Sequence, residues 1–178
     1  QMEGVIAQYA LIPARFDAAG PLRFQSWTEA AGALFGHAFL HAGPLHLLMN
    51  MLLFVQAGPF VEQRMGSSRF AILYGASILG GAAAYILINP HATGPAVGAS
   101  GAVCGVFAAY FLAVRPTPRA ALSDPRVRNA MLSFVGINVV LMALLPLPIA
   151  WEAHLGGFVV GALSYLLMAP RPRTRPWG

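Results

Sequence analysis

Four polar residues interrupt otherwise apolar stretches of this chain, and their types are those of nucleophilic catalysis. Ser100 stands in the tetrapeptide GASG, and His154 stands in the pentapeptide AHLGG. His46 and Asn50 are four residues apart, so on a helix they share one face. A serine hydroxyl becomes a nucleophile when a base within hydrogen-bond reach takes its proton, and histidine suits that task near neutral pH. These types predict a Ser100–His154 pair.

No acid completes a triad with this pair. Apart from Glu152, which would point to a different helix face from His154, the apolar stretches contain no Asp or Glu. We therefore expect a dyad. The reaction of such a dyad passes through a negatively charged tetrahedral oxygen, which needs donors where the charge develops. The available donors are His46, Asn50 and the backbone N–H of Ser100.

The composition indicates that these residues are carried by membrane-spanning helices. Hydrophobic residues make up 57% of the 178 residues and charged residues only 10%, compared with about 25% in soluble domains. Mean hydropathy is +0.64. The apolar runs approach the ~17–25 residues that a spanning helix needs. We expect an all-α, polytopic membrane helical bundle. Cys104 is the only cysteine, and we assign it no chemistry.

Five complete spans are expected, together with a truncated first helix, in one domain over residues 1–178. Gly43-Pro44 marks the start of the first complete span, since proline is tolerated at the first helical position. The spans are predicted at residues 45–61, 69–88, 100–114, 130–145 and 149–169.

The remaining parts of the domain follow from these spans. The predicted parts are the end of the truncated helix (1–13), an outer membrane-associated loop (14–43), the five-helix core (44–169) and a basic cytoplasmic tail (170–178).

The arginines predict the orientation of the bundle. All basic residues are arginines, eleven in number, and nine of them follow residue 61 in connections on one side of the spans. Basic residues in short loops stay cytoplasmic, so we read the formal charge of +5 as topology rather than nucleic-acid binding. At ~1.5 Å per residue, Ser100, His154 and His46 lie ~22, ~26 and ~27 Å from that side. We therefore expect a water-filled pocket near the outer face.

Small residues explain how the serine and the histidine would meet. Gly101 and Gly105 form a G-x-x-x-G pattern after the serine, and Gly157 and Gly161 form the same pattern after His154. Such patterns let two membrane helices approach closely. His154 falls on the same stripe as its two glycines, so the imidazole should face the seam between the helices.

The motifs resemble those of the rhomboid family of intramembrane proteases over roughly residues 9–168. The matching features are GASG including Gly98, AHLGG, the H-x-x-x-N of His46 and Asn50, and the segment EQR before Gly66. The resemblance implies that Ser100 is the nucleophile, His154 the general base, and His46 with Asn50 the oxyanion side chains.

The resemblance also implies structural roles for other residues. His37 and His41 match histidines of the family's membrane-embedded first loop, and Glu62 and Arg64 resemble a structural cytoplasmic clasp. Family membership implies at least six helices, substrates that are single-span membrane proteins, contact with membrane lipid, and neither cofactor nor metal. Richness in Ala, Gly and Arg hints at a bacterial source, hence an inner membrane with the site facing the periplasm.

Other functions are considered beside this one. His37, His41 and His46 suggest a zinc site, but there is no H-E-x-x-H, and a Gly-Pro pair breaks the helix between them. A non-catalytic relative that binds transmembrane clients is the main alternative, although such relatives usually lack the serine or the histidine. A channel or carrier is disfavoured, because no charged residue lines a path through the bilayer centre. We expect His91 to be a surface residue and Asn138 to bond a neighbouring helix.

Overall fold

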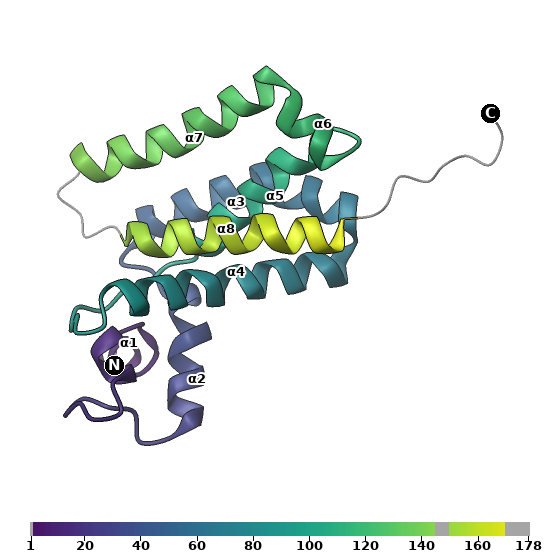
Figure 1. Cartoon of the computed structure of the whole chain (residues 1–178). Coiled ribbons are helices and arrows are strands. Elements are labelled where there is room, and N and C mark those ends of the chain that lie inside the picture. Colours follow the sequence, from purple (N-terminus) through teal and green to yellow (C-terminus); the bar gives the residue numbers. More distant parts are fainter. Residues whose placement is uncertain (1, 145–149, 170–178) are drawn as a thin grey trace, which may run out of the picture.

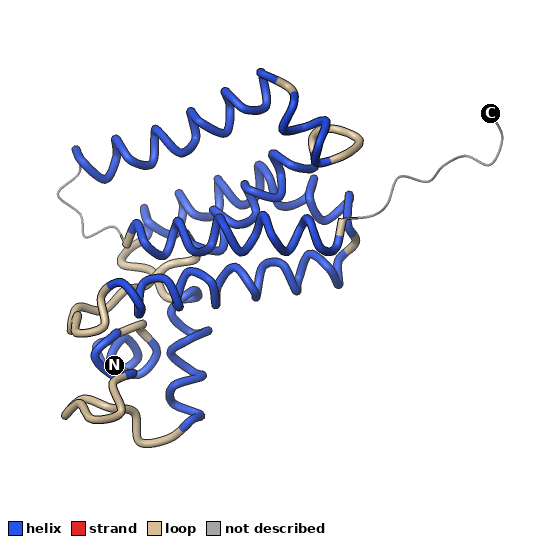
Figure 2. The backbone as a smooth tube through the Cα atoms, viewed as in Figure 1, coloured by secondary structure: helices blue, strands red, loops and turns tan. Residues whose placement is uncertain are grey.

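The computed structural model describes residues 2–144 and 150–169, and within these ranges the chain is helical without a named strand (Figure 2). Only one isolated antiparallel bridge, Leu11 with Ala96, interrupts this pattern. The elements in chain order are α1 (Met2–Tyr9), η1 (Pro13–Phe16), α2 (Trp27–Gly36), η2 (His37–Phe39), α3 (Pro44–Met65), α4 (Ser67–Ile88), α5 (Ser100–Ala113), α6 (Pro118–Ser123), α7 (Pro125–Leu144) and α8 (Trp151–Met168).

Helix α5 lies at the centre of the bundle, where α3, α4 and α8 pack against it (Figure 1). Every residue from 101 to 109 is buried, which fits a helix that is apolar on all sides. Helix α7 lies at the edge of the bundle. It reaches α5 through a ring stack of Phe134 on Phe107, with centroids 4.5 Å apart, and Phe134 also faces Phe158 of α8.

Helices α3 and α4 are joined by one residue, Gly66. Its φ of +86° lies in the left-handed region that glycine adopts without strain. The connection predicted from the sequence, residues 62–68, was too long, because the glycine allows the chain to reverse within a single position. Glu62 and Arg64 therefore belong to the last turns of α3.

The segment from residue 14 to 43, predicted to be a loop, contains α2 and two short 3-10 helices. Helix α2 forms because its first turn is capped: the Ser26 hydroxyl accepts the Glu29 N–H, and the Glu29 carboxylate accepts the Gln25 N–H at 3.1 Å. Backbone hydrogen bonds in both directions between Leu11 and Ala96 tie this N-terminal region to the α4–α5 connection. Figure 1 shows α1 and α2 at that end of the bundle.

The connection between α5 and α7 is also more structured than predicted. The fourth span was expected to begin at residue 130, whereas α7 begins at Pro125 because the Asp124 side chain accepts the Arg126 N–H at 2.8 Å. Arg115 donates from Nε and Nη2 to Asp124, at 2.8 and 2.5 Å. These hydrogen bonds hold the pKa of Asp124 below its usual range. They fasten the start of α7 to the end of α5.

Large apolar side chains cover the outside of the bundle. Leu45, Leu132 and Leu163 are 70%, 65% and 52% exposed, which suits an apolar surrounding rather than water. By length and composition alone, α3 and α4 are the two described helices that could cross a membrane, and α5 is apolar but shorter. The predicted basic tail at 170–178 and the predicted span limits at 145 and 149 lie outside the described residues.

Candidate active site

Ser100 and His154 meet at one end of the bundle. Ser100 is the first residue of α5 and His154 lies in the first turns of α8, and His154 Nε2 is 2.8 Å from Ser100 Oγ. Both side chains are partly exposed. If Nδ1 of His154 carries the proton of the neutral ring, Nε2 is free to accept the serine proton. Nδ1 is buried and has no hydrogen-bond partner among the described residues, so Ser100 is the ring's one hydrogen-bond partner in those ranges.

The glycines of α5 and α8 let the two helices approach closely enough for this contact. A Cβ placed on Gly157 would lie 2.6 Å from the carbonyl carbon of Gly101, and one on Gly105 would lie 2.7 Å from the carbonyl oxygen of Gly157. A Cβ on Gly161 would collide with the backbone of Gly105. Only hydrogen fits at these positions. The seam that was predicted from the G-x-x-x-G patterns is therefore a backbone-to-backbone contact.

His46 and Asn50 both lie against Gly98, two residues before the serine. A Cβ on Gly98, whose φ is +124°, would be 2.7 Å from His46 Cε1, 2.9 Å from His46 Nε2 and 3.9 Å from Asn50 Nδ2. The Ala42 N–H donates to His46 Nδ1 at 3.4 Å, which assigns the ring proton of neutral His46 to Nε2. The Cε1–Nε2 edge of the ring thus faces Gly98, and this edge carries a donor.

Asn50 is almost fully buried and has one donor to spare. Its Nδ2 donates to the His46 carbonyl at 3.0 Å, which uses one of the two amide protons. The backbone N–H of Ser100 is a further donor, because the first amides of a helix have no intrahelical acceptor. The positive end of the α5 dipole lies at the same point. Two side-chain donors thus lie against Gly98, and a backbone donor begins the helix two residues later.

His37 and His41, the predicted structural histidines of the first loop, contact Gly98 and His46 respectively. His37 is buried, its Nδ1 bonds the Ala33 carbonyl at 3.0 Å, and its own carbonyl accepts the Gly98 N–H at 2.9 Å. Burial lowers the pKa of His37 and so favours its neutral ring. The His41 ring packs edge-on against His46 with centroids 5.2 Å apart. Among the described residues no three His, Cys, Asp or Glu side chains gather as metal ligands.

Two features of the site were not found by sequence reasoning. Asn89, at the end of α4, donates to the buried Glu152 carboxylate at 2.8 Å, two residues before His154. Ser77 of α4 lies in the glycine seam, where a Cβ on Gly105 would lie 2.6 Å from Ser77 Cβ. No pattern in the sequence links residues so far apart.

One other expectation differs from the structure. Asn138 does not bond a neighbouring helix: it donates to the Phe134 carbonyl of its own helix at 2.8 Å, as short polar side chains in membrane helices often do. The clasp expected of Glu62 and Arg64 stays a prediction; the Arg64 guanidinium lies over the Phe60 ring.

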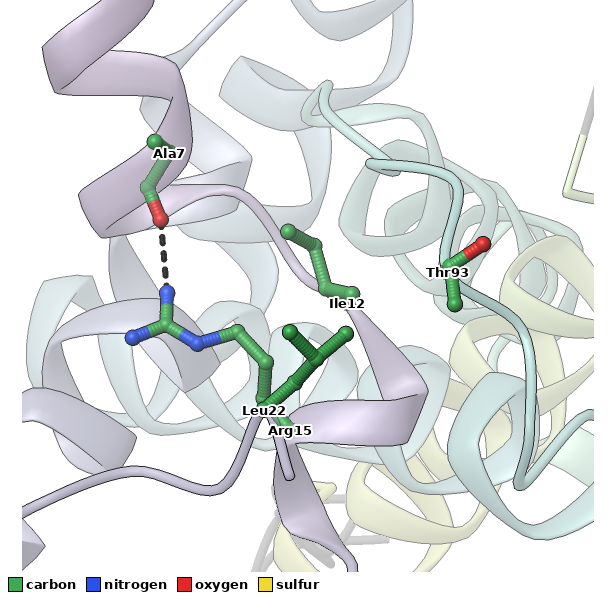
Figure 3. A pocket seen from close by; sticks show the side chains of 5 residues that line it. All are labelled: Ala7, Ile12, Arg15, Leu22 and Thr93. Atoms are coloured by element: carbon green, nitrogen blue, oxygen red, sulfur yellow. Dashed lines mark hydrogen bonds between the residues drawn. The ribbon is translucent and has the colours of Figure 1, made fainter. Parts of the chain in front are cut away.

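A separate hollow of about 370 Å³ lies in the N-terminal region (Figure 3). Arg15 lines it and donates to the Ala7 carbonyl at 2.6 Å. The other lining residues are Ala7, Ile12, Leu22 and Thr93. None of them is a predicted site residue, so the hollow is not part of the Ser100–His154 site.

The fold and the site define a class, that of helical membrane bundles with a hydrogen-bonded serine and histidine at one end. Within that class the chain belongs to the rhomboid family: the Rhomboid domain model matches residues 24–171. Rhomboid-family proteins are integral membrane proteins.

Several curated proteins are similar to the chain. It is 36% identical to RHOMBOID-like protein 1 of Arabidopsis thaliana over 79% of this chain and 35% of the relative. It is 30% identical to the rhomboid protease GluP of Bacillus subtilis over 68% of this chain and 23% of the relative. It is 32% identical to the putative rhomboid protease YdcA of the same bacterium, over 75% and 66%. The chain thus spans between about a quarter and two thirds of the length of these relatives.

Proposed function

We propose that this chain is an intramembrane serine endopeptidase that hydrolyses peptide bonds of single-span membrane proteins with a Ser100–His154 dyad. The observation that carries the proposal is the 2.8 Å contact between His154 Nε2 and Ser100 Oγ. This distance lies within the reach that a general base needs to take the serine proton. Family membership supports the same reaction, because two of the similar proteins are named rhomboid proteases.

The reaction proceeds in two balanced halves. Nε2 of His154 takes the proton from Ser100 as Oγ bonds to the substrate carbonyl carbon. The imidazolium then gives that proton to the leaving amine as the C–N bond breaks, which leaves an acyl group on Oγ. In the second half His154 takes a proton from water as the water oxygen bonds to the ester carbon; the C–Oγ bond then breaks, the carboxylic acid leaves, and the imidazolium returns its proton to Ser100 Oγ.

The charge that develops on the carbonyl oxygen is met by donors at the start of α5. Three donors lie around Gly98 and the serine: His46 Nε2–H, the free amide proton of Asn50 and the Ser100 backbone N–H. Each such donor contributes about 10²- to 10³-fold in rate when it is fixed before the reaction.

The proposed substrate and location follow from the position of the dyad. Ser100 begins α5 and His154 lies near the start of α8, so the dyad is at the end of the bundle opposite most arginine-bearing connections. With those connections in the cytoplasm, the dyad acts near the outer face, in a bacterium the periplasmic face of the inner membrane. A substrate helix must unwind there to expose its carbonyl groups, so helix-breaking residues near its outer end should favour cleavage.

The proposal is tested with a serine-directed fluorophosphonate probe and with single-span substrates in proteoliposomes. The parent chain should label and cleave, whereas the Ser100→Ala and His154→Ala variants should do neither while keeping the parent melting temperature. The matched control is Ser133→Ala, which removes an exposed hydroxyl from α7, a helix that contributes no residue to the site. A folded parent chain that neither labels nor cleaves would instead favour the client-binding alternative.

A further inference from the structure

The geometry points to Asn89 and Glu152 as positioning residues, whose mutual hydrogen bond fixes the first turn of α8 so that His154 reaches Ser100. This inference rests on the proposed function and adds two residues to its machinery. Neither residue would touch the substrate. The bond joins Asn89 Nδ2 to Glu152 Oε1 at 2.8 Å.

The first turn of α8 has no side-chain cap. Its N-cap residue is Ala150, which offers no side-chain acceptor, and its own backbone contributes only the N–H groups that bond back to Ala150. Within the described ranges just two side-chain-to-side-chain hydrogen bonds join α8 to other elements. They are Asn89–Glu152 and Ser100–His154, and both end in this first part of the helix.

The two bonds act on opposite sides of α8. Glu152 and His154 are two residues apart, so their side chains leave the helix axis roughly 200° from each other. Glu152 points to the end of α4 and His154 points to α5, and α8 packs against both of these helices. Between the two side chains the Ala153 carbonyl fits against glycines, since a Cβ on Gly81 or Gly101 would lie 2.8 or 2.9 Å from its oxygen.

The position of this turn matters because, within the described residues, the imidazole is hydrogen-bonded at one nitrogen only, to Ser100. His154 Nδ1 has no partner among the described residues, unlike the base of a triad, whose second nitrogen is held by a carboxylate. The distance from Nε2 to Oγ therefore depends on where the backbone of α8 places the ring. A rotation of the first turn by a few degrees would carry the ring away from the serine.

The environment of Glu152 fits a positioning role. The residue is 7% exposed, and a buried carboxylate requires a partner. Its place in the first turn of α8 lets the helix dipole favour a negative charge. Asn89, the C-cap residue of α4, supplies the only side-chain donor to this carboxylate in the described part of the chain.

The test exchanges the donor and the acceptor of the Asn89–Glu152 hydrogen bond between the two positions. Each new side chain has the same length as the one it replaces. Asn89→Asp places two carboxyl groups where an amide now donates, and it should slow fluorophosphonate labelling at least about tenfold. The double variant N89D/E152Q restores a donor on residue 152 and an acceptor on residue 89, with the parent's net charge. Its labelling rate should return to within about threefold of the parent.

Further variants make the comparison specific. Glu152→Gln alone keeps an acceptor but removes its charge, so its labelling rate should fall between those of the parent and N89D. Thr93→Asp adds the same carboxylate to an exposed position of the same connection, and it should also leave the rate unchanged. If N89D fails to fold, Asn89→Ala and Glu152→Ala replace it, and their double variant should lose no more rate than either single variant.

The outcomes separate this inference from the proposed function. A parent chain that does not label overturns both. A parent that labels, with an N89D variant that labels equally fast, overturns the positioning role alone. The role is also overturned if N89D is slow and the exchanged variant, folded with the parent melting temperature, stays equally slow.

Discussion

Replacing Gly157 with alanine should separate α5 from α8 and thereby separate the dyad. The added Cβ would lie 2.6 Å from the Gly101 carbonyl carbon and 3.1 Å from Gly101 Cα. Carbon atoms ordinarily approach to about 3.5 Å, so the helices must part by about 1 Å. Both obstructing atoms belong to backbone, so no side chain can rotate away.

The consequence for activity follows from the present contact distance. His154 lies one turn before Gly157, and its Nε2 is 2.8 Å from Ser100 Oγ. With about 1 Å added, the distance from Nε2 to Oγ would grow to about 3.8 Å. This is beyond the ~3.2 Å within which a base can take the serine proton. Displacements of that size cost on the order of 10²-fold in rate, and overpacking costs about 1–3 kcal/mol in stability.

The assay is the second-order rate of fluorophosphonate labelling in detergent, measured beside thermal unfolding. Gly75→Ala is the matched control, because Gly75 also lies in a spanning helix and a Cβ there meets nothing within 4 Å. The control should keep the parent rate and stability. A Gly157→Ala variant that labels within about threefold of the parent would show that the seam does not set the dyad distance.

Three further predictions concern other parts of the structure. His46→Ala should lower the rate of substrate cleavage about 10²- to 10³-fold with an unchanged melting temperature, because it removes one oxyanion donor. Arg115 lowers the pKa of Asp124, so their pair stabilises the fold above about pH 4 and loses this effect as the pH falls through the lowered pKa. Asp124→Asn should therefore lower the melting temperature at pH 7. It should also make the melting temperature fall less as the pH is lowered into the acid range. Ala96→Pro removes the N–H that bonds Leu11 at 2.9 Å and should expose the N-terminal region to limited proteolysis, whereas Ala96→Ser should not.

The sequence predicted those features that depend on composition and local spacing. Long apolar runs fix the positions of α3, α4 and α5 to within a few residues, because helices in an apolar solvent must satisfy their own backbone. The approach of Ser100 to His154 could be inferred because glycines at every fourth position leave only one face on which two helices can come so close.

Other features escaped prediction because they depend on single capping residues or on distant pairs. Helix α2 begins at a capping signal formed by Ser26 and Glu29. The spacing of apolar residues does not reveal this signal. Helix α7 begins early because of the Asp124 side chain. Asn89 and Glu152 are 63 residues apart, and neither belongs to a repeated pattern, so only the folded arrangement reveals their bond.

The most direct test of the Ser100–His154 account is to map the fluorophosphonate adduct by mass spectrometry after labelling the folded parent chain. The account predicts one phosphonyl group, on the peptide that contains Ser100, and no adduct on the same peptide of the His154→Ala variant. An adduct on another serine, or one on Ser100 that forms equally fast without the imidazole, would contradict it.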